Sequence, residues 1–120
     1  MEQEIELDIW GKHFSLPVIF DCYPGETVTK AQQEALALFP SQLDQVEQSK
    51  KKVLEYITLK NECVVEDIHT IVRPDYLLIK HEDIPRVALL CTYRFDPEHG
   101  LAIVYSSDGS VEVGLQDIIL

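Results

Sequence analysis

The stretch EQEIELDIWGKHFSLPVIFDC, residues 2–22, predicts the start of the fold, because apolar and polar residues alternate along it with a period of two. Its first half places two sets of residues on opposite faces, apolar Ile5, Leu7 and Ile9 and acidic Glu4, Glu6 and Asp8. Gly11-Lys12 can turn the chain, and a second alternating strand follows from His13. We expect an antiparallel hairpin with one core face and one row of carboxylates. Because Pro17 cannot donate to a ladder, the second strand either lies at a sheet edge or turns the position of the missing N–H to its unpaired side, and we favour the edge.

Two helices are expected after this hairpin. Thr29-Lys30-Ala31-Gln32 has the form of a capping box, so a helix should begin near Lys30. Pro40 cannot continue the helical ladder and ends that helix. Ser41 offers a new N-cap, and apolar residues at helical spacing extend a second helix to about Leu59.

The second half of the chain is predicted to be mostly antiparallel sheet. Four apolar runs are separated by turn residues, namely Tyr76–Lys80, Arg86–Phe95, Leu101–Tyr105 and Val111–Gly114. Residues 86–95 are apolar on both faces, which indicates a central strand, whereas residues 61–75 fit a short helical turn as well as a strand. We therefore expect one α+β domain over residues 1–120, with a mostly antiparallel sheet of about six strands packed on two helices inserted after the N-terminal β-hairpin.

Composition limits the classes of partner. The 120 residues carry a formal net charge of −11, which repels nucleic acid and anionic lipid alike. No apolar run reaches the ~18 residues of a membrane span, and the acidic start differs from a signal peptide, so we expect a cytoplasmic protein. Cys22, Cys63 and Cys91 form no C-x-x-C pair, and we expect reduced thiols without a zinc site.

Negative charge is concentrated on the predicted strands and their connections. The helical middle, residues 29–60, is nearly neutral, with four acids and five bases. The acids elsewhere include the strand residues Glu4, Glu6 and Asp8 and the loop residues Glu82, Asp83, Asp96, Glu98, Asp108, Glu112 and Asp117. Such a surface attracts a basic protein and resembles the polyanion that a nuclease binds. Solubility alone is the alternative explanation.

The strongest local signal is Asp96-Pro97-Glu98-His99-Gly100, which has three interpretations. As a metal site, it would need a further ligand, for which His81 is the candidate. As an acid–base pair, Glu98 and His99 are suitable residue types, but no nucleophile accompanies them. As a turn, Asp stands at the first position, Pro at the second, and Gly where the chain returns to the strand with a positive φ. Turn statistics favour this third interpretation.

Apolar and basic side chains add to this picture. By alternation, Trp10 falls on the carboxylate face, where Trp10 or Tyr93 could serve as an apolar anchor for a partner. For Trp10, packing under a loop is the favoured interpretation. The triplet Lys50-Lys51-Lys52 is expected to lie on the solvent face of the second helix, near Glu47 and Glu55.

The stretch from Leu89 to Val104, which contains Glu-His-Gly between two apolar segments, and the closing Val113-Gly114-Leu115-Gln116-Asp117 resemble a group of small bacterial domains without an assigned enzyme activity. The T-x-x-Q helix start and Tyr56 are similar as well. Domains of this kind occur among immunity proteins of contact-dependent growth inhibition and other polymorphic toxin systems. The resemblance implies toxin neutralisation and no catalytic role for Glu98 or His99.

The charge pattern and the resemblance lead to one hypothesis, a non-enzymatic immunity protein without a cofactor that neutralises a cognate, basic toxin domain. The residues expected to bind the toxin are Glu4, Glu6, Asp8, Trp10, Glu82, Asp83, Asp96, Glu98 and His99. The alternative is a small metal-dependent enzyme centred on the loop at residues 96–99. A third possibility is a domain in which this loop only fixes the sheet.

Overall fold

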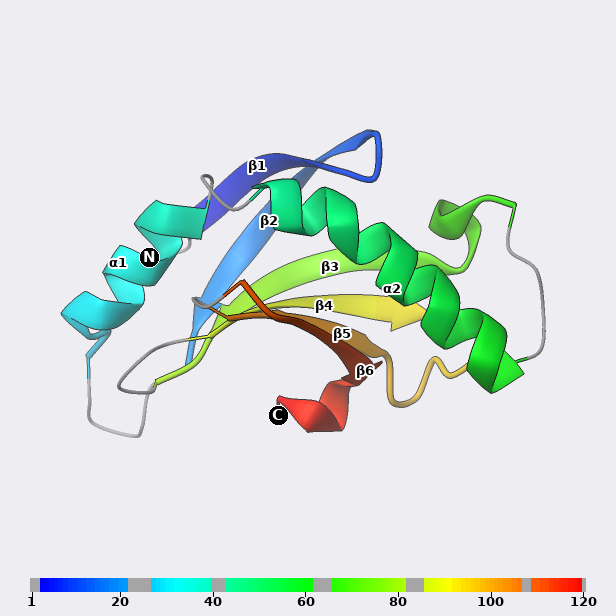
Figure 1. Ribbon diagram of the computed structural model, residues 1–120. Helices are drawn as coiled ribbons and strands as arrows, with labels where there is room; N and C mark the ends of the chain where they lie inside the picture. Colours follow the sequence, from blue (N-terminus) through cyan, green and yellow to red (C-terminus); the bar gives the residue numbers. More distant parts are fainter. Residues whose placement is uncertain are drawn as a thin grey trace.

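The structure, a computed structural model, describes residues 3–21, 27–39, 43–61, 66–81, 86–106 and 109–119 (Figure 1). Its elements, in which η marks a single 3₁₀ turn, are β1 (Gln3–Ile9), β2 (Lys12–Phe20), α1 (Lys30–Leu38), α2 (Leu43–Asn61), η2 (Ile68–Thr70), β3 (Val72–Ile79), β4 (Val87–Tyr93), β5 (Leu101–Tyr105), β6 (Val111–Leu115) and η3 (Gln116–Ile118). The predicted α+β class is confirmed, with six strands and two helices that follow the second strand. Within residues 61–75, a helical turn comes first and a strand follows.

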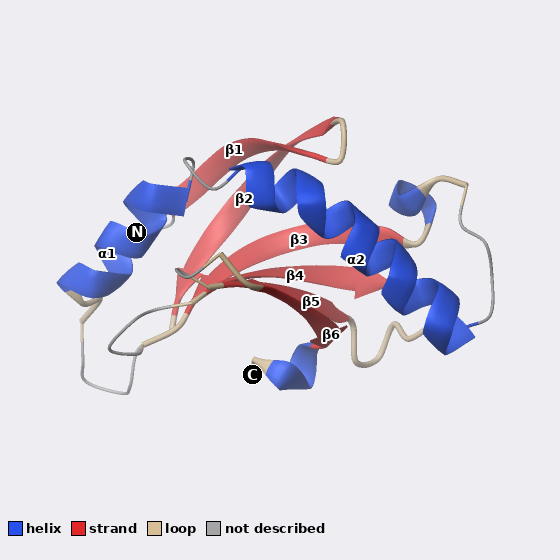
Figure 2. Cartoon of the chain, viewed as in Figure 1, coloured by secondary structure: helices blue, strands red, loops and turns tan. Residues whose placement is uncertain are grey.

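The six strands form one sheet in the order β1-β2-β3-β4-β5-β6. Neighbouring strands are antiparallel except β2 and β3, which pair in parallel through Val18–Phe20 and Leu77–Ile79. Parallel neighbours need a crossover connection, and this one contains both helices. Helix α2 lies across one face of the sheet, whereas α1 lies toward one end (Figure 2). The expected packing on two helices is confirmed in part: α2 lies across the face, and α1 packs at its end, where it contacts β3.

The turn between β1 and β2 consists of Trp10 and Gly11, one residue earlier than expected. Both have positive φ, 52° and 81°, which is the pattern of a type I′ hairpin turn. Lys12 already belongs to the second strand and pairs with Ile9, so the predicted Gly11-Lys12 turn is wrong. The left-handed backbone at Trp10 also breaks the alternation of β1. Its indole turns toward the core and is only 5% exposed.

β2 is not an edge strand, contrary to the expectation from Pro17. It lies between β1 and β3. The parallel ladder with β3 begins only at Val18, so Pro17 precedes that ladder and its missing N–H removes no bond from it. The outermost strands of the described sheet are β1 and β6.

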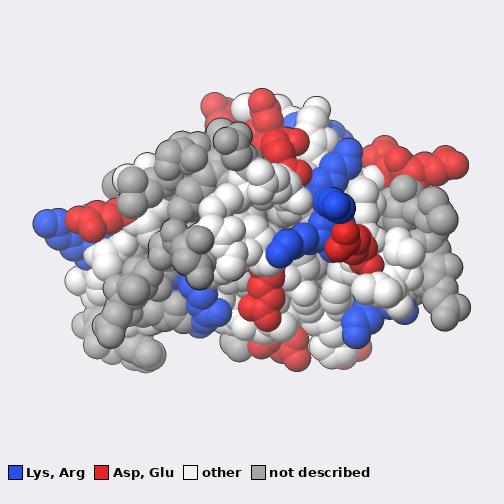
Figure 3. Space-filling view, viewed as in Figure 1, with Lys and Arg blue, Asp and Glu red and all other residues white. Residues whose placement is uncertain are grey.

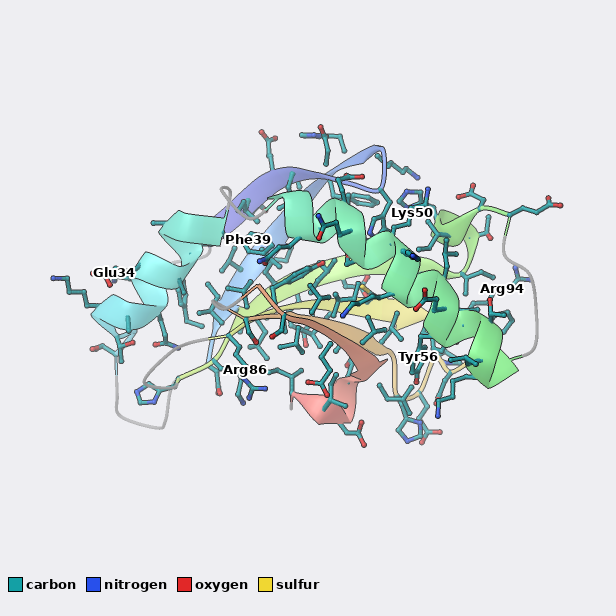
Figure 4. The ribbon with its side chains drawn as sticks, viewed as in Figure 1. Glu34, Phe39, Lys50, Tyr56, Arg86 and Arg94 are labelled. Carbon is teal, nitrogen blue, oxygen red and sulfur yellow. The ribbon has the colours of Figure 1, made fainter. Side chains whose placement is uncertain are left out.

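A buried hydrogen-bond cluster holds α2 on the sheet. The Nε1–H group of Trp10 donates to the carbonyl oxygen of Val46 at 3.1 Å and to Ser49 Oγ at 3.3 Å. Ser49 Oγ also lies 3.1 Å from the hydroxyl oxygen of Tyr105. The ring of Phe39, which is labelled in Figure 4, meets the ring of Tyr105 edge to face, 5.6 Å between centroids. The cluster therefore connects the first turn, the helix and β5 through satisfied polar groups.

Helix α1 begins as predicted, and its cap also attaches it to the sheet. Thr29 Oγ1 accepts the backbone N–H of Gln32 at 3.1 Å, and Gln32 Oε1 accepts the N–H of Thr29 at 2.9 Å. The capping box is therefore confirmed. Gln32 is fully buried, and its Nε2 donates to the carbonyl oxygens of Asp21 at 2.8 Å and Ile79 at 3.1 Å. One side chain thus caps α1 and binds the ends of β2 and β3.

β4 is a central strand, as predicted, and it is buried on both faces. Its residues Val87, Leu89, Cys91 and Tyr93 belong to the main core, and Ala88 and Leu90 belong to a second, smaller core on the other face. Ile118 and Ile119 pack on that smaller core. The residue pattern did not predict a cover for this face.

We expect Gln32→Met to lower the free energy of unfolding by about 2–4 kcal/mol, because one backbone N–H and two carbonyl groups lose their buried partner while the side-chain volume changes little. Urea denaturation measures the difference. Gln33→Met, at the next and exposed position of α1, is the matched control and should change stability by less than about 0.5 kcal/mol. Equal losses in both variants would contradict the bracing role of Gln32.

Candidate functional site

The row of carboxylates predicted for β1 is present. Glu4, Glu6 and Asp8 are exposed, whereas Leu7 and Ile9 between them are buried. Figure 3 shows acidic side chains along the upper border of the molecule, where β1 lies. The alternation of the sequence therefore placed the three acids on the solvent face of the hairpin, as expected.

Only one basic side chain meets this row among the described residues. His13 Nδ1 lies 2.9 Å from Asp8 Oδ1, and both side chains are mostly exposed. Ser15 Oγ donates to Glu4 Oε2 at 3.4 Å. Within the described chain, no hydrogen bond or ion pair is found for the Glu6 carboxylate. The row retains most of its negative charge and is open to a cation.

The two expected aromatic anchors are buried, which corrects the predicted binding set. Trp10 is 5% exposed and Tyr93 is 2% exposed, so neither can insert into a partner. The exposed large apolar side chains among the described residues are different ones: Leu59 at 81%, Ile19 at 47% and Phe95 at 42%. Ile19 lies an even number of residues after His13 on β2, so it is on the same face of the sheet as the carboxylates. The alternation of the sequence could have identified it. Phe95 lies just beyond the last paired residue of β4.

The remaining predicted residues fall into two groups. Glu82 and Asp83 lie outside the described residues. His81 follows β3, at the opposite end of β4 from His99, and the seven residues of that strand separate the two ends by about 20 Å. His81 therefore cannot join His99 at one metal ion, and the predicted four-ligand set is wrong.

Residues 96–100 form a turn between β4 and β5. The N–H of Gly100 donates to the carbonyl oxygen of Asp96 at 2.9 Å, and the N–H of His99 donates to Asp96 Oδ1 at 3.2 Å. His99 Nδ1 lies 3.0 Å from the same Oδ1. Gly100 has φ 66°, which favours glycine. The turn interpretation is confirmed, and Glu98 and His99 are exposed on it.

The contact between Asp96 and His99 changes the acidity of both groups. The hydrogen bond from His99 lowers the pKa of the Asp96 carboxyl, and the same bond raises the pKa of the His99 imidazole. In the described part of the chain, no three His, Cys, Asp or Glu residues gather as a metal site would require. The loop thus contains one ion pair, between Asp96 and His99 Nδ1. The other ring nitrogen, His99 Nε2, does not contact Asp96.

Gly100 also connects the turn to η3. A Cβ atom at this position would overlap the side-chain amide of Gln116 and come within 2.9 Å of the Cys91 carbonyl oxygen. Gln116 Nε2 donates to that same oxygen at 3.1 Å. The glycine is therefore needed for space as well as for its backbone angle, and the turn is part of the sheet's own construction.

An aromatic group lies beside this turn. The ring centroids of Tyr56 and Tyr93 are 6.3 Å apart, and those of Tyr93 and Phe95 are 5.8 Å apart. Figure 4 places Tyr56 near the C-terminal end of α2. Burial and the charges of Asp96 and Asp117 raise the pKa of the Tyr56 phenol. This end of the molecule therefore combines carboxylates with one exposed aromatic ring, Phe95.

The outer side of α2 offers no enclosed binding site. Lys50, Lys51 and Lys52 are exposed as expected, and Lys52 Nζ donates to the carbonyl oxygen of Val111 at 2.9 Å, which ties α2 to β6. Leu54 and Leu59 line a shallow hollow, whose lining among the described residues comes from α2 alone. The convex surface of one helix does not enclose a small molecule.

Cys91 is a free thiol that is fully buried, and burial raises its pKa, which disfavours the reactive thiolate. Cys22 and Cys63 lie outside the described residues. In the part of the chain that the structure describes, no helix has the length and apolar character needed to cross a membrane.

A family model described as "Domain of unknown function (DUF6985)" matches residues 1–120. No curated protein matches the chain, and no solved structure matches it. These comparisons do not test the resemblance to immunity proteins, which stays a prediction. The function has to be inferred from the chain's own residues.

We expect Gly100→Ala to lower the free energy of unfolding by about 2–4 kcal/mol, because the new methyl group adds overlap with Gln116 to the strain of a positive φ. Gly11→Ala is the matched control. Its φ is 81°, but its Cβ would meet nothing within 4 Å, so backbone strain alone should cost about 1–2 kcal/mol. Thermal unfolding of both variants measures the difference. A loss at Gly100 no larger than that at Gly11 would contradict the close contact.

The pair of Asp96 and His99 should be visible in a titration. The His99 pKa is raised, so the stability that His99 contributes is present below its unfolded pKa and is lost as pH rises through the folded value. The Asp96 pKa is lowered, so its contribution is lost as pH falls through that folded value. The pair therefore stabilises most between about pH 4 and 6.5.

NMR titration of the His99 ring should give a higher midpoint in the parent protein than in Asp96→Asn. Asp117→Asn removes a charge with a smaller effect on the His99 pKa, so it should lower the midpoint less. The pairing would be refuted by an unchanged midpoint in Asp96→Asn.

Proposed function

The chain belongs to the DUF6985 family, and we propose that it is an immunity protein that binds a cognate, basic toxin domain through the carboxylate face of its N-terminal hairpin. The face is formed by Glu4, Glu6 and Asp8 on β1. In this proposal the protein blocks the toxin's active site or its substrate path and performs no chemistry of its own.

The observation that supports this proposal is the exposed carboxylate row on an outermost strand. Three acids on one strand face, with His13 as their one described basic neighbour, create a local negative potential. Such a potential accelerates encounter with a positively charged protein and selects against anionic partners. A toxin that binds nucleic acid carries positive charge for its own substrate, so an acidic surface can occupy the same site.

The turn with Glu98 and His99 extends the same interaction. The Trp10-Gly11 turn and the turn at residues 96–100 lie at the same end of the sheet (Figure 1). Phe95, beside the second turn, gives a partner an exposed aromatic ring to contact. In many interfaces such a ring lies at the centre and charged residues form the rim. Asp96 mainly shapes the turn, so Glu98 and His99 are the side chains available for contact.

The test is capture of a partner from a lysate of the bacterium that encodes the chain, at low salt and at ~0.5 M salt. We expect one basic protein, held less firmly at high salt, whose toxicity to growing cells is abolished by co-expression of this chain. Failure to capture a basic protein, together with a metal ion retained after dialysis, would contradict neutralisation and favour the metal-enzyme alternative.

Matched variants assign the interaction to the carboxylate row. Glu4→Gln, Glu6→Gln and Asp8→Asn together remove three charges from β1, and we expect at least about tenfold weaker toxin binding. Glu34→Gln, Glu47→Gln and Glu55→Gln together remove the same charge from exposed helical positions and should weaken binding by less than about threefold. Equal losses would show that net charge, and not this face, directs the interaction.

A further inference from the structure

The outer edge of β1 is available for another strand. β1 is seven residues long and has β2 as its one neighbour in the described sheet. Figure 1 shows it along the upper border, with no described strand beyond it. Edge strands are usually protected by proline, a bulge or charged side chains, and β1 has no proline or bulge, so its carboxylates are its one protection of these kinds.

The hairpin turn determines which main-chain groups face that edge. Ile9 and Lys12 close a type I′ turn, so they form a hydrogen-bonded pair. Hydrogen-bonded and non-hydrogen-bonded pairs alternate along an antiparallel ladder. Counting back from Ile9, the residues in non-hydrogen-bonded positions are Glu4, Glu6 and Asp8. Their N–H and C=O groups point away from β2, toward the open edge.

Pro17 supports this assignment independently. It lies opposite Glu4, in one of the pairs assigned as non-hydrogen-bonded. A proline has no N–H and would break the ladder at a hydrogen-bonded position. Its presence in the middle of β2 therefore agrees with the alternation deduced from the turn.

The same three residues carry the exposed carboxylates. A strand added beside β1 would exchange main-chain hydrogen bonds with Glu4, Glu6 and Asp8 and set one residue of its own directly opposite each. Side chains of directly opposite residues lie on the same face of a sheet, with Cβ atoms about 5 Å apart. The opposite residues would therefore meet three carboxylates, and opposite charge is the favourable choice.

A second copy of this chain does not fit the edge. Antiparallel pairing of two β1 strands about their centres would set Glu6 against Glu6 and Glu4 against Asp8. Like charges directly opposite one another destabilise a strand pair, so the edge rejects its own copy while it accepts a basic strand.

The other edge of the sheet is less suited to strand addition. β6 has five residues instead of seven. Lys52 Nζ already donates to the carbonyl oxygen of Val111, the first residue of β6. A strand added there would have to compete with this contact between α2 and the sheet.

We propose that β1 binds its partner by strand addition. An extended segment of the partner pairs with the outward main-chain groups of Glu4, Glu6 and Asp8 and places Lys or Arg opposite each carboxylate. The proposal rests on the proposed function, because the basic toxin is the source of the added strand. It assigns a mode of binding to the carboxylate face, with main-chain bonds for affinity and charge pairs for selectivity.

The probe is a disulfide-closed β-hairpin peptide whose outer strand reads Lys-Thr-Lys-Val-Lys, compared with the same hairpin carrying Glu at the three Lys positions. A closed hairpin is used because its strand is ordered before binding. We expect the lysine hairpin to bind at least about tenfold more tightly than the glutamate hairpin. By NMR, exchange of the backbone amides of Glu4, Glu6 and Asp8 should slow on binding.

Two variants at Glu6 separate the contribution of its main-chain hydrogen bond from that of its side-chain charge. Glu6→Pro removes an outward N–H at an edge position that tolerates proline, and Glu6→Gln keeps the N–H but removes the charge. We expect Glu6→Pro to weaken hairpin binding by about tenfold or more and Glu6→Gln by about two- to fivefold. Circular dichroism melts establish that both variants are folded at the temperature of measurement.

Equal weakening by the two variants, unchanged amide exchange at Glu4, Glu6 and Asp8, or absence of binding by the lysine hairpin would overturn strand addition. The same variants applied to the captured toxin distinguish this outcome from failure of the proposed function. A toxin that loses affinity for the three-charge variant but binds Glu6→Pro and Glu6→Gln equally leaves the proposed function standing and refutes strand addition. Hairpin binding without any toxin partner refutes the proposed function alone.

Discussion

The buried hydrogen bonds among Trp10, Val46, Ser49 and Tyr105 are the constraint on which the rest of the structure depends. An indole N–H enclosed in a core must find an acceptor, because an unmet buried donor costs about 1–3 kcal/mol. Here the acceptors are on α2, and Ser49 reaches Tyr105 on β5. The bonds form only when the first turn, the rotation of α2 and the position of β5 agree. They thereby fix the register of β1, and a slip of one residue would move its carboxylates to the core face.

The parts of the fold that were predicted correctly depend on neighbours in sequence. Alternation identified β1 and β2, the capping box located the start of α1, and two apolar faces marked β4 as central. The errors depend on tertiary context. Trp10 adopts a positive φ, which is uncommon for a bulky residue and could not be expected from its type. The burial of its side chain in the core stabilises this backbone conformation. Pro17 favoured an edge position for β2. The structure has β3 beside β2, and their parallel ladder begins at Val18, after the proline.

The candidate site was predictable to the same extent. Glu4, Glu6 and Asp8 share a face because strands have a period of two, and the turn at residues 96–100 follows from its own Asp, Pro and Gly. The separation of His81 from His99 required the strand directions, which no local pattern contains. The direction of the main-chain groups of β1 required the turn type as well. Side-chain patterns alone therefore gave the charge of the surface but not its hydrogen-bonding edge.

The parallel junction between β2 and β3 has a consequence for motion. It comprises three residue pairs, whereas β1 and β2 share seven. The N-terminal hairpin is thus internally well paired, whereas its junction with the remaining sheet consists of a short ladder, the N–H of Asp21 bound to the carbonyl oxygen of Ile79, the Gln32 side chain and the contacts of Trp10. Local opening in proteins follows such cooperative units. We therefore expect the hairpin to detach from β3 at a lower free-energy cost than global unfolding. A ligand that binds only the closed form shifts this equilibrium by mass action. Occupation of the outermost strand would therefore rigidify a junction that the ligand itself never touches.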